Sequence, residues 1–154
     1  MLKDLLLGGM SSRLNYYLCA MRWARRRGFT RLANHVSRRL ERKHGLFIPA
    51  RANIAASCRF PHPTGIVLGV GVALGERTVV YQNVTIGAAR RGNGAVERYP
   101  NVGNDCVIFA GAVLVGDIKI GDGCVIGANA VVTKSFPHNS IIVGAPAMAV
   151  NSKK

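Results

Sequence analysis

His62 is the residue of this chain best suited to acid–base chemistry. It lies in the run HPTGIVLG, and an unperturbed imidazole titrates near neutral pH, so it can take a proton from a hydroxyl group and later deliver one. The other histidines, His35, His44 and His138, fall in or beside a basic helical pattern or near the C-terminus, and we expect structural roles for them. An exposed histidine could act as a general base, although a histidine considered apart from its motif is more often structural.

The four cysteines do not form a metal-binding pattern. Cys19, Cys58, Cys106 and Cys124 include no CxxC pair, and no histidine lies at ligand spacing beside any of them. We therefore expect no metal site. Cys106 and Cys124 are 18 residues apart, and we expect them to be buried, reduced thiols stacked on one another.

A period of six residues runs through the chain from Ile54 onward. Apolar residues open twelve hexads, and glycine often follows them; the opening positions are Ile54, Phe60, Leu68, Leu74, Val80, Ile86, Val102, Ile108, Leu114, Ile120, Ile126 and Val132. In a triangular coil each hexad supplies one short strand and one tight corner, with its first side chain inside. Three hexads make an 18-residue coil, so the sequence predicts about four stacked coils.

Two interruptions break this period. An extra pair of residues falls between His62 and Ile66, and the excursion AARRGNGAVERYPN runs from Ala88 to Asn101. A loop that breaks a regular solenoid usually lines a functional site. Arg90 and Arg91, at the entry of the excursion, could meet an acidic substrate, although exposed loop arginines are more often simply solvated.

The N-terminal third is basic and has a helical pattern. Residues 1–51 hold 12 Lys or Arg and 2 acidic residues, which accounts for most of the net charge of +14. Apolar residues four apart predict an amphipathic helix over residues 29–43, with Thr30 as its N-cap and Gly45 as its stop. An earlier helix is expected within residues 11–26.

This positive charge favours anionic partners. It can attract an anionic membrane surface or an acidic substrate, although a solvated charged face is the simpler interpretation. No nucleic-acid-reading module accompanies the charge, so we expect no nucleic-acid partner. The apolar run of residues 5–7 is too short for a signal peptide or a membrane span. We expect a cytoplasmic protein that the basic helices could hold at the inner face of the membrane.

The motifs resemble those of the hexapeptide-repeat acyltransferases. HPTGIVLG, followed by VVYQNVTIG, looks like the signature of the serine acetyltransferase-like branch, which includes sugar and polysaccharide O-acetyltransferases, and the run IGDGC to GAPAMAV looks like its closing coil. The resemblance implies a mainly β fold: a left-handed parallel β-helix over residues 51–154 with a loop at 88–101, preceded by a basic helical segment over residues 1–50. It also implies acetyl-CoA as co-substrate and a homotrimer with each active site between neighbouring prisms.

The resemblance also assigns roles to individual residues. It makes His62 the general base, and it makes Arg98 and Tyr99 candidates for binding the acceptor, with Tyr99 able to donate a hydrogen bond to the acceptor or the oxyanion. The pantetheine arm of acetyl-CoA needs small corner residues, and its phosphate-rich end favours a basic one. The candidates are Gly87, Ala88, Ala110 and Ala128 for the arm and Lys134 for the nucleotide end.

Three positions depart from the serine acetyltransferase pattern. Phe47 stands in place of an Asp that orients the base, Pro61 in place of an Asp beside it, and Tyr99 in place of a second His. These changes remove groups that hold and activate a small amino acid. What orients His62 instead is open between a backbone carbonyl and a carboxylate such as Glu76 or Glu97.

We therefore predict an acetyl-CoA-dependent O-acetyltransferase that acts on a hydroxyl of a sugar, a polysaccharide or a lipid-linked precursor. Serine O-acetylation for cysteine biosynthesis is the alternative. A non-catalytic trimeric scaffold, whose basic helices bind a partner, is the second alternative.

Overall fold

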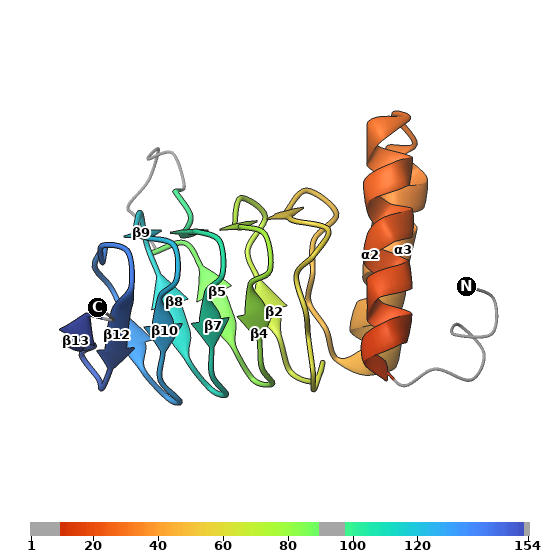
Figure 1. Ribbon diagram of the computed structural model, residues 1–154. Helices are drawn as coiled ribbons and strands as arrows, with labels where there is room; N and C mark the ends of the chain where they lie inside the picture. Colours follow the sequence, from red (N-terminus) through yellow and green to blue (C-terminus); the bar gives the residue numbers. More distant parts are fainter. Residues whose placement is uncertain (1–9, 90–97, 153–154) are drawn as a thin grey trace.

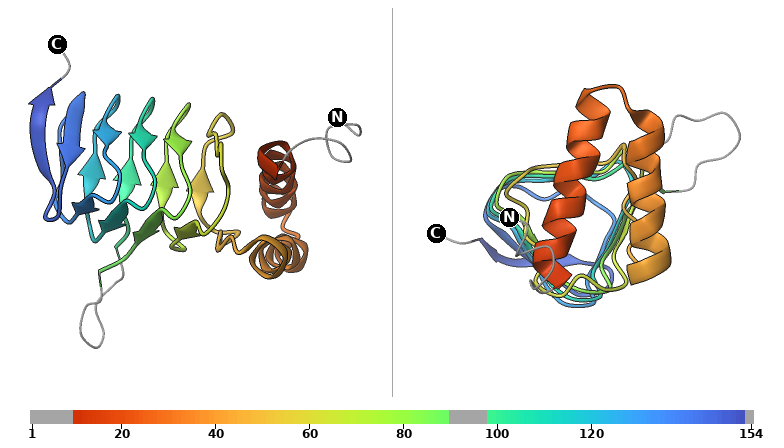
Figure 2. Two further views of the ribbon diagram at one scale, coloured as in Figure 1. Left: turned by 90° about the horizontal axis from the view of Figure 1, so that it is seen from below. Right: turned by 90° about the vertical axis from the view of Figure 1, so that its right-hand side faces the viewer.

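Two helices precede a three-sided prism in the computed structural model, which describes residues 10–89 and 98–152 (Figure 1). The helices are α2 (Met10–Arg26) and α3 (Thr30–His44). They form a hairpin that lies across one end of the prism, as the view along the prism axis shows (Figure 2). The two expected helices are confirmed.

Three parallel sheets form the walls of the prism. Wall 1 contains β2 (Val67–Leu68), β5 (Thr85–Gly87), β8 (Val113–Val115) and β11 (Val131–Val132). Wall 2 contains β1 (Asn53–Ile54), β3 (Ala73–Leu74), β6 (Asn101–Val102) and β9 (Lys119–Ile120). Wall 3 contains β4 (Val79–Val80), β7 (Val107–Ile108), β10 (Val125–Ile126) and β12 (Ser140–Val143), with β13 (Met148–Ser152) paired antiparallel to β12.

The hexad-opening residues fill the interior of this prism. Leu68, Ile86 and Leu114 stack on wall 1, and none of them is exposed to solvent. Their backbones bond to the coils before and after them, so a two-residue strand is enough to hold each wall. The predicted left-handed parallel β-helix is confirmed. Parallel pairing begins earlier than the first hexad, because Phe47 already bridges to Val67 on wall 1.

The walls meet along three edges, which we name by the walls they join. The 3/1 edge consists of residues 61–66, 81–84, 109–112 and 127–130. The 1/2 edge consists of residues 49–52, 69–72, 88–89, 98–100, 116–118 and 133–135. The 2/3 edge consists of residues 55–58, 75–78, 103–106, 121–124 and 137–139.

The pairing register shows where the two interruptions go. Val67 pairs with Thr85, which lies 18 residues further along the chain, as a regular coil requires. Phe47 bridges to Val67 over 20 residues, and the two extra residues leave the coil at the 3/1 edge. Thr85 pairs with Val113 over 28 residues, because the long excursion leaves at the 1/2 edge. Both insertions are therefore extruded at edges, and the walls stay in register.

The helical hairpin closes the first end of the prism. Leu14, Leu18 and Leu40 are buried in the same cluster as Ile54 and the interior of the following coils. Gly45 ends α3 in the left-handed conformation, as predicted. The predicted N-cap, Thr30, is wrong: Thr30 is the first helical residue, since the Ala33 N–H bonds to the Phe29 carbonyl, and Phe29 occupies the cap without a side-chain bond. Among the described helices, none is long and apolar enough to cross a membrane.

Three of the four cysteines lie inside the prism. Cys58, Cys106 and Cys124 are buried at the 2/3 edge, and Cys19 is exposed on α2. The expected stacking of Cys106 on Cys124 is confirmed, because the residues that follow them pair directly on wall 3. Burial raises the pKa of the Cys58 thiol to about 11 and that of the Cys106 thiol to about 12.

This difference in burial predicts selective alkylation. In the folded protein at pH 8, iodoacetamide should modify Cys19 readily and leave Cys58 and Cys106 unmodified, because the buried thiols are protonated and covered. Peptide mass mapping before and after unfolding in guanidinium chloride measures this. Equal labelling of all four thiols in the folded protein would contradict this packing.

Candidate active site

The candidate site residues lie on two edges of the prism. The 3/1 edge carries His62, Ala110 and Ala128. The 1/2 edge carries Ala88, Arg98, Tyr99 and Lys134, together with Gly87 at the end of β5. Both edges border wall 1, one on each side of it. A single chain therefore brings these residues together in two groups, with the width of wall 1 between them.

His62 is exposed where the two extra residues widen the 3/1 edge. The His62 carbonyl accepts a hydrogen bond from the Thr64 N–H at 2.8 Å, which closes a turn around Pro63. The imidazole lies 6.1 Å from the Tyr81 ring, and Tyr81 stacks on Phe109 with 5.3 Å between ring centroids. The imidazole thus stands at one end of an aromatic column along the edge, open to an incoming substrate.

None of the carboxylates described in the structure lies within 4 Å of the His62 nitrogens. Glu76 was one candidate to orient His62, and this expectation is wrong. Glu76 belongs to the 2/3 edge, where it accepts a hydrogen bond from the Ser57 hydroxyl. The other carboxylate candidate, Glu97, lies outside the described residues, as do Arg90 and Arg91. Phe47 lies on wall 1 with its side chain largely exposed.

The corners of the 3/1 edge allow close approach of a ligand. Ala110 and Ala128 occupy equivalent corner positions in successive coils, and the Ala110 carbonyl accepts a hydrogen bond from Asn129 N–H at 3.0 Å. Asn129 adopts a positive φ of 57° next to Gly111, whose own φ is 72°. A side chain on Gly111 would collide with the Asn129 amide, so this corner must keep its small residue.

Gln82 is a polar residue of this edge that the sequence analysis did not single out. It lies one residue after Tyr81, in the corner position that Ala110 and Ala128 hold in the later coils. Its Oε1 atom is buried and accepts no hydrogen bond within the described chain. A buried acceptor without a donor is costly, so it is suited to receive an N–H or O–H from a ligand. A polar side chain among alanines in one column is the signal that could have revealed it.

Tyr99 and Arg98 are fixed at the 1/2 edge. The Tyr99 ring packs over Gly69 and Gly71, where any β-carbon would come within about 2.5 Å of ring carbons. Arg98 donates a hydrogen bond to Asp117, with 2.8 Å between Nη1 and Oδ2. Asp117 is thus a further residue of this edge that sequence reasoning missed, because the two side chains are 19 positions apart. These contacts therefore hold Arg98 and Tyr99 in place at the 1/2 edge.

The remaining predicted residues of the 1/2 edge are accessible. Lys134 is exposed, and its ammonium lies 5.6 Å from the centre of the Phe136 ring. A β-carbon on Gly87 would meet no atom within 4 Å, so open space lies beside this backbone. In residues 10–89 and 98–152, no three His, Cys, Asp or Glu side chains are grouped to hold a metal ion.

The contact between Tyr99 and the glycines can be tested by substitution. Gly71→Ala should displace the Tyr99 ring and lower turnover, because the new methyl group occupies the position of the ring. Tyr99→Phe keeps the ring in place and removes only the hydroxyl, so it separates positioning from hydrogen bonding. Turnover and the melting temperature of both variants measure this. Unchanged turnover in Tyr99→Phe would eliminate the proposed hydroxyl donor, and unchanged turnover in Gly71→Ala would eliminate the positioning role.

Known proteins share both the repeat and the fold. Residues 99–134 match the family described as bacterial transferase hexapeptide (six repeats). A serine acetyltransferase of Mycobacterium tuberculosis is 35% identical over 132 residues, which are 86% of this chain and 57% of that protein. A serine acetyltransferase of Staphylococcus aureus strain Mu50 is 37% identical over 102 residues, 66% of this chain and 47% of that protein. The chain thus spans about half the length of the curated relatives it matches.

Solved structures give the same result. The crystal structure of serine acetyltransferase from Vibrio cholerae superposes with a TM-score of 0.87 at 27% identity, covering 100% of this chain and 59% of that one. Soybean serine acetyltransferase in complex with serine superposes with a TM-score of 0.78 at 32% identity, covering 86% of this chain and 56% of that one. The repeat, the left-handed β-helix and these relatives together identify the chain as a member of the hexapeptide-repeat acyltransferase family, in its serine acetyltransferase-like branch.

Proposed function

We propose that the protein is an acetyl-CoA-dependent O-acetyltransferase with His62 as its general base and L-serine as its acceptor. The observation that carries the chemistry is the exposed imidazole that the two extra residues place on the 3/1 edge. The preference for serine rests on the relatives named serine acetyltransferase. It replaces the sugar or polysaccharide as the leading acceptor, because the names of these relatives specify serine.

The chemistry needs no covalent enzyme intermediate. The His62 imidazole takes the proton of the acceptor hydroxyl while the hydroxyl oxygen attacks the thioester carbonyl carbon. When the carbon–sulfur bond breaks, the imidazolium returns the proton to the leaving thiolate, so the base is regenerated. Donors that face the developing oxyanion stabilise the tetrahedral intermediate, and the Tyr99 hydroxyl is our candidate for such a donor.

A homotrimer would complete the site. Because the two candidate edges border the same wall, a threefold axis facing wall 1 sets the 3/1 edge of one protomer beside the 1/2 edge of the next. The outward side chains of wall 1 are suited to burial: Phe47 and Val67 are 44% and 40% exposed in the single chain, and Val113 and Val131 are apolar as well. His62 would then face Arg98 and Tyr99 of a neighbouring protomer.

The same arrangement provides a channel for acetyl-CoA. Ala110 and Ala128 would lie along one side of the pantetheine arm, and Gly87 and Ala88 of the neighbouring protomer along the other. Lys134 lies further along the 1/2 edge, where it can meet the phosphates. The unpaired Oε1 of Gln82 is positioned on the 3/1 edge to accept a hydrogen bond from an amide of the arm.

A sugar hydroxyl is the second candidate acceptor. Phe47, Pro61 and Tyr99 replace groups that the serine enzymes use near the amino acid, and the Tyr81–Phe109 stack beside His62 offers an aromatic surface of the kind that sugar rings pack against.

The division of the chain into a basic helical segment of residues 1–50 and a β-helix of residues 51–154 remains a prediction.

Acceptor-dependent release of CoA tests this proposal. Wild-type protein should release CoA thiol in the presence of L-serine, and His62→Ala should lower this rate by about two to four orders of magnitude. His35→Ala is the matched control, because His35 is an exposed histidine on α3 far along the chain from the edge. Release with sugars or acidic oligosaccharides but not with serine would favour the second candidate. No release of CoA with any acceptor would contradict the proposed acetyltransferase activity and favour the non-catalytic trimeric scaffold.

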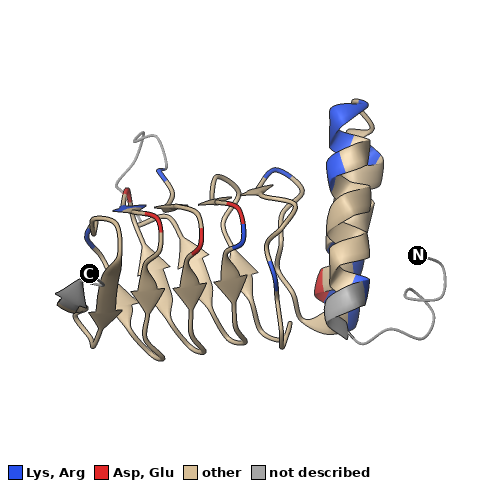
Figure 3. Cartoon of the chain, viewed as in Figure 1, with Lys and Arg blue, Asp and Glu red and all other residues tan. Residues whose placement is uncertain are grey.

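We also propose that the turn of the helical hairpin contacts anionic membrane from the cytoplasmic side. Trp23, Phe29 and Leu32 are 50%, 53% and 47% exposed there, and the Arg27 guanidinium lies 5.8 Å from the centre of the Trp23 ring. Basic residues surround the turn (Figure 3). Aromatic side chains bordered by arginines favour the interface of an anionic bilayer.

Liposome sedimentation tests the membrane contact. The full chain should sediment with vesicles that contain anionic lipid and much less with neutral vesicles, and Trp23→Ala with Phe29→Ala should weaken this binding. Val150→Ala, at an exposed apolar residue of β13, is the control substitution. Equal sedimentation of all three proteins would contradict the contact.

A further inference from the structure

An arginine-rich cavity lies between α2 and the first coils of the prism. Its volume is about 380 Å³, which is sufficient for a small metabolite. Its lining runs along wall 2, from Ala52 to Asn104, and contains none of the residues of the proposed active site, so it does not depend on that proposal. Its polar lining consists of Arg22, Arg25 and Arg26 from α2 and Asn53, Glu76 and Asn104 from the prism.

The three arginines form one charged surface on α2. Arg25 and Arg26 lie three and four residues after Arg22, so both are neighbours of Arg22 on the helix surface. None of them forms an ion pair with a carboxylate in the described chain, although the arginines at positions 77 and 98 do. Like charges at this spacing destabilise a helix. A bound anion would remove that repulsion.

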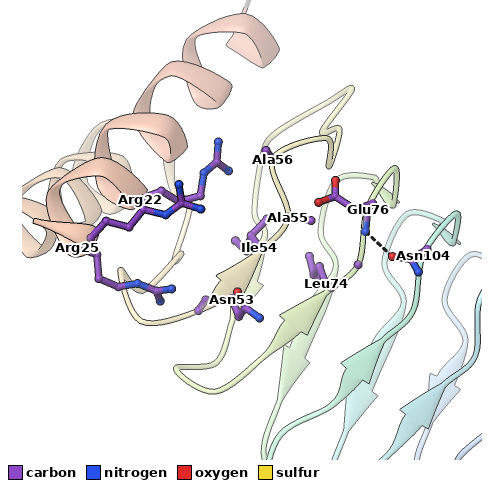
Figure 4. A pocket seen from close by; sticks show the side chains of 12 residues that line it. Arg22, Arg25, Asn53, Ile54, Ala55, Ala56, Leu74, Glu76 and Asn104 are labelled. Atoms are coloured by element: carbon purple, nitrogen blue, oxygen red, sulfur yellow. Dashed lines mark hydrogen bonds between the residues drawn. The ribbon is translucent and has the colours of Figure 1, made fainter.

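Contacts with the start of the first coil hold Arg25 at the cavity. The Arg25 Nη1 atom donates to the Arg51 carbonyl at 3.1 Å, which ties α2 to the chain as it enters the first coil. Figure 4 shows Arg22 and Arg25 extending from α2 toward that coil, with Glu76 on the opposite side of the cavity. The Arg25 guanidinium is therefore held by the start of the first coil, on the side of the cavity away from Glu76.

The far side of the cavity has a different character. Glu76 is held there by two bonds: its carboxylate accepts from the Ser57 hydroxyl, and its N–H donates to Asn104 Oδ1 at 2.8 Å. No arginine nitrogen of α2 comes within 4 Å of the Glu76 carboxylate. The cavity thus keeps its positive and negative ends apart, and a ligand that fills it must present a negative group to α2 and a hydrogen-bond donor to Glu76.

We propose that this cavity binds a small phosphate monoester, with the phosphate against Arg22, Arg25 and Arg26 and a hydroxyl or amino group directed at Glu76. A phosphate offers a double negative charge and three acceptor oxygens, which match several guanidinium forks better than a single carboxylate does. The ester's free hydroxyl or amino group supplies the donor that Glu76 accepts. Binding would also fasten α2 to the first coil of the prism.

Calorimetric titration of the full chain tests this site. The probes are inorganic phosphate and glycerol phosphate, each at constant ionic strength set with chloride. Wild-type protein should bind both with saturation, and glycerol phosphate more tightly. Arg22→Gln with Arg26→Gln should weaken both by at least about tenfold, because two charge-assisted contacts are lost. Glu76→Gln should reduce the preference for glycerol phosphate and leave inorganic phosphate unchanged.

Arg38→Gln with Arg42→Gln is the matched control, because these two exposed arginines of α3 have the same spacing and remove the same charge. Binding equal to wild type is expected. A parallel loss in this control would show that the anions respond only to net charge and would overturn the proposal. Unchanged binding in the α2 variant would show that these arginines do not hold the anion, and would overturn it too. The absence of saturable heat in wild type would do the same. Arg22→Lys keeps the charge and the fold, and weaker binding in this variant would show that the planar fork is recognised.

Discussion

The 18-residue coil is the constraint on which the rest of this molecule depends. Each strand before β12 has only two or three residues, and its backbone groups bond to the neighbouring coils. Leu68, Ile108 and Ile126 lie inside the prism and are not exposed to solvent. A residue added within a wall would turn the inward side chains that follow it outward. Insertions are therefore tolerated only at the edges.

This constraint places the two irregularities of the sequence at the edges, where the predicted site residues lie. The extra pair of residues places an imidazole outside the 3/1 edge, and the long excursion brings Arg98 and Tyr99 to the 1/2 edge. The glycines at positions 69 and 71 leave room for the Tyr99 ring, so the preceding corner of the same edge shapes the base of the loop. The proposed function needs a neighbouring protomer for the same reason, since each edge of a single chain carries only one part of the predicted site.

The sequence predicts the interior far better than the edges. The hexad register and the burial of Cys106 follow from local periodicity, because each repeats a contact with the next coil. Gly45 was predictable as the end of α3, because glycine readily adopts the left-handed conformation found there. Gln82, Asp117 and the arginine cavity could not be found in this way, because they depend on which corner a residue reaches and on how α2 docks. Glu76 illustrates the same limit: it is close to His62 in the chain but lies on another edge.

The prediction of Thr30 as the N-cap of α3 is wrong for a related reason. Thr30 has the preferred residue type for a cap, but the turn after Gly28 and the contact between Trp23 and Phe29 place the cap one residue earlier. A tertiary contact between the helices thus determines the boundary, and local preference does not.

Activity of mixed oligomers tests the central claim, that the site is assembled from two edges of neighbouring protomers, most directly. His62→Ala and Arg98→Ala, each inactive alone, are unfolded together, refolded together in equal amounts and assayed for CoA release. A shared site predicts that activity returns to about a quarter of wild type, because random cyclic trimers pair an intact 3/1 edge with an intact 1/2 edge in that share of interfaces. Activity no greater than the sum of the separate variants would show that each protomer carries its own site and would contradict the account.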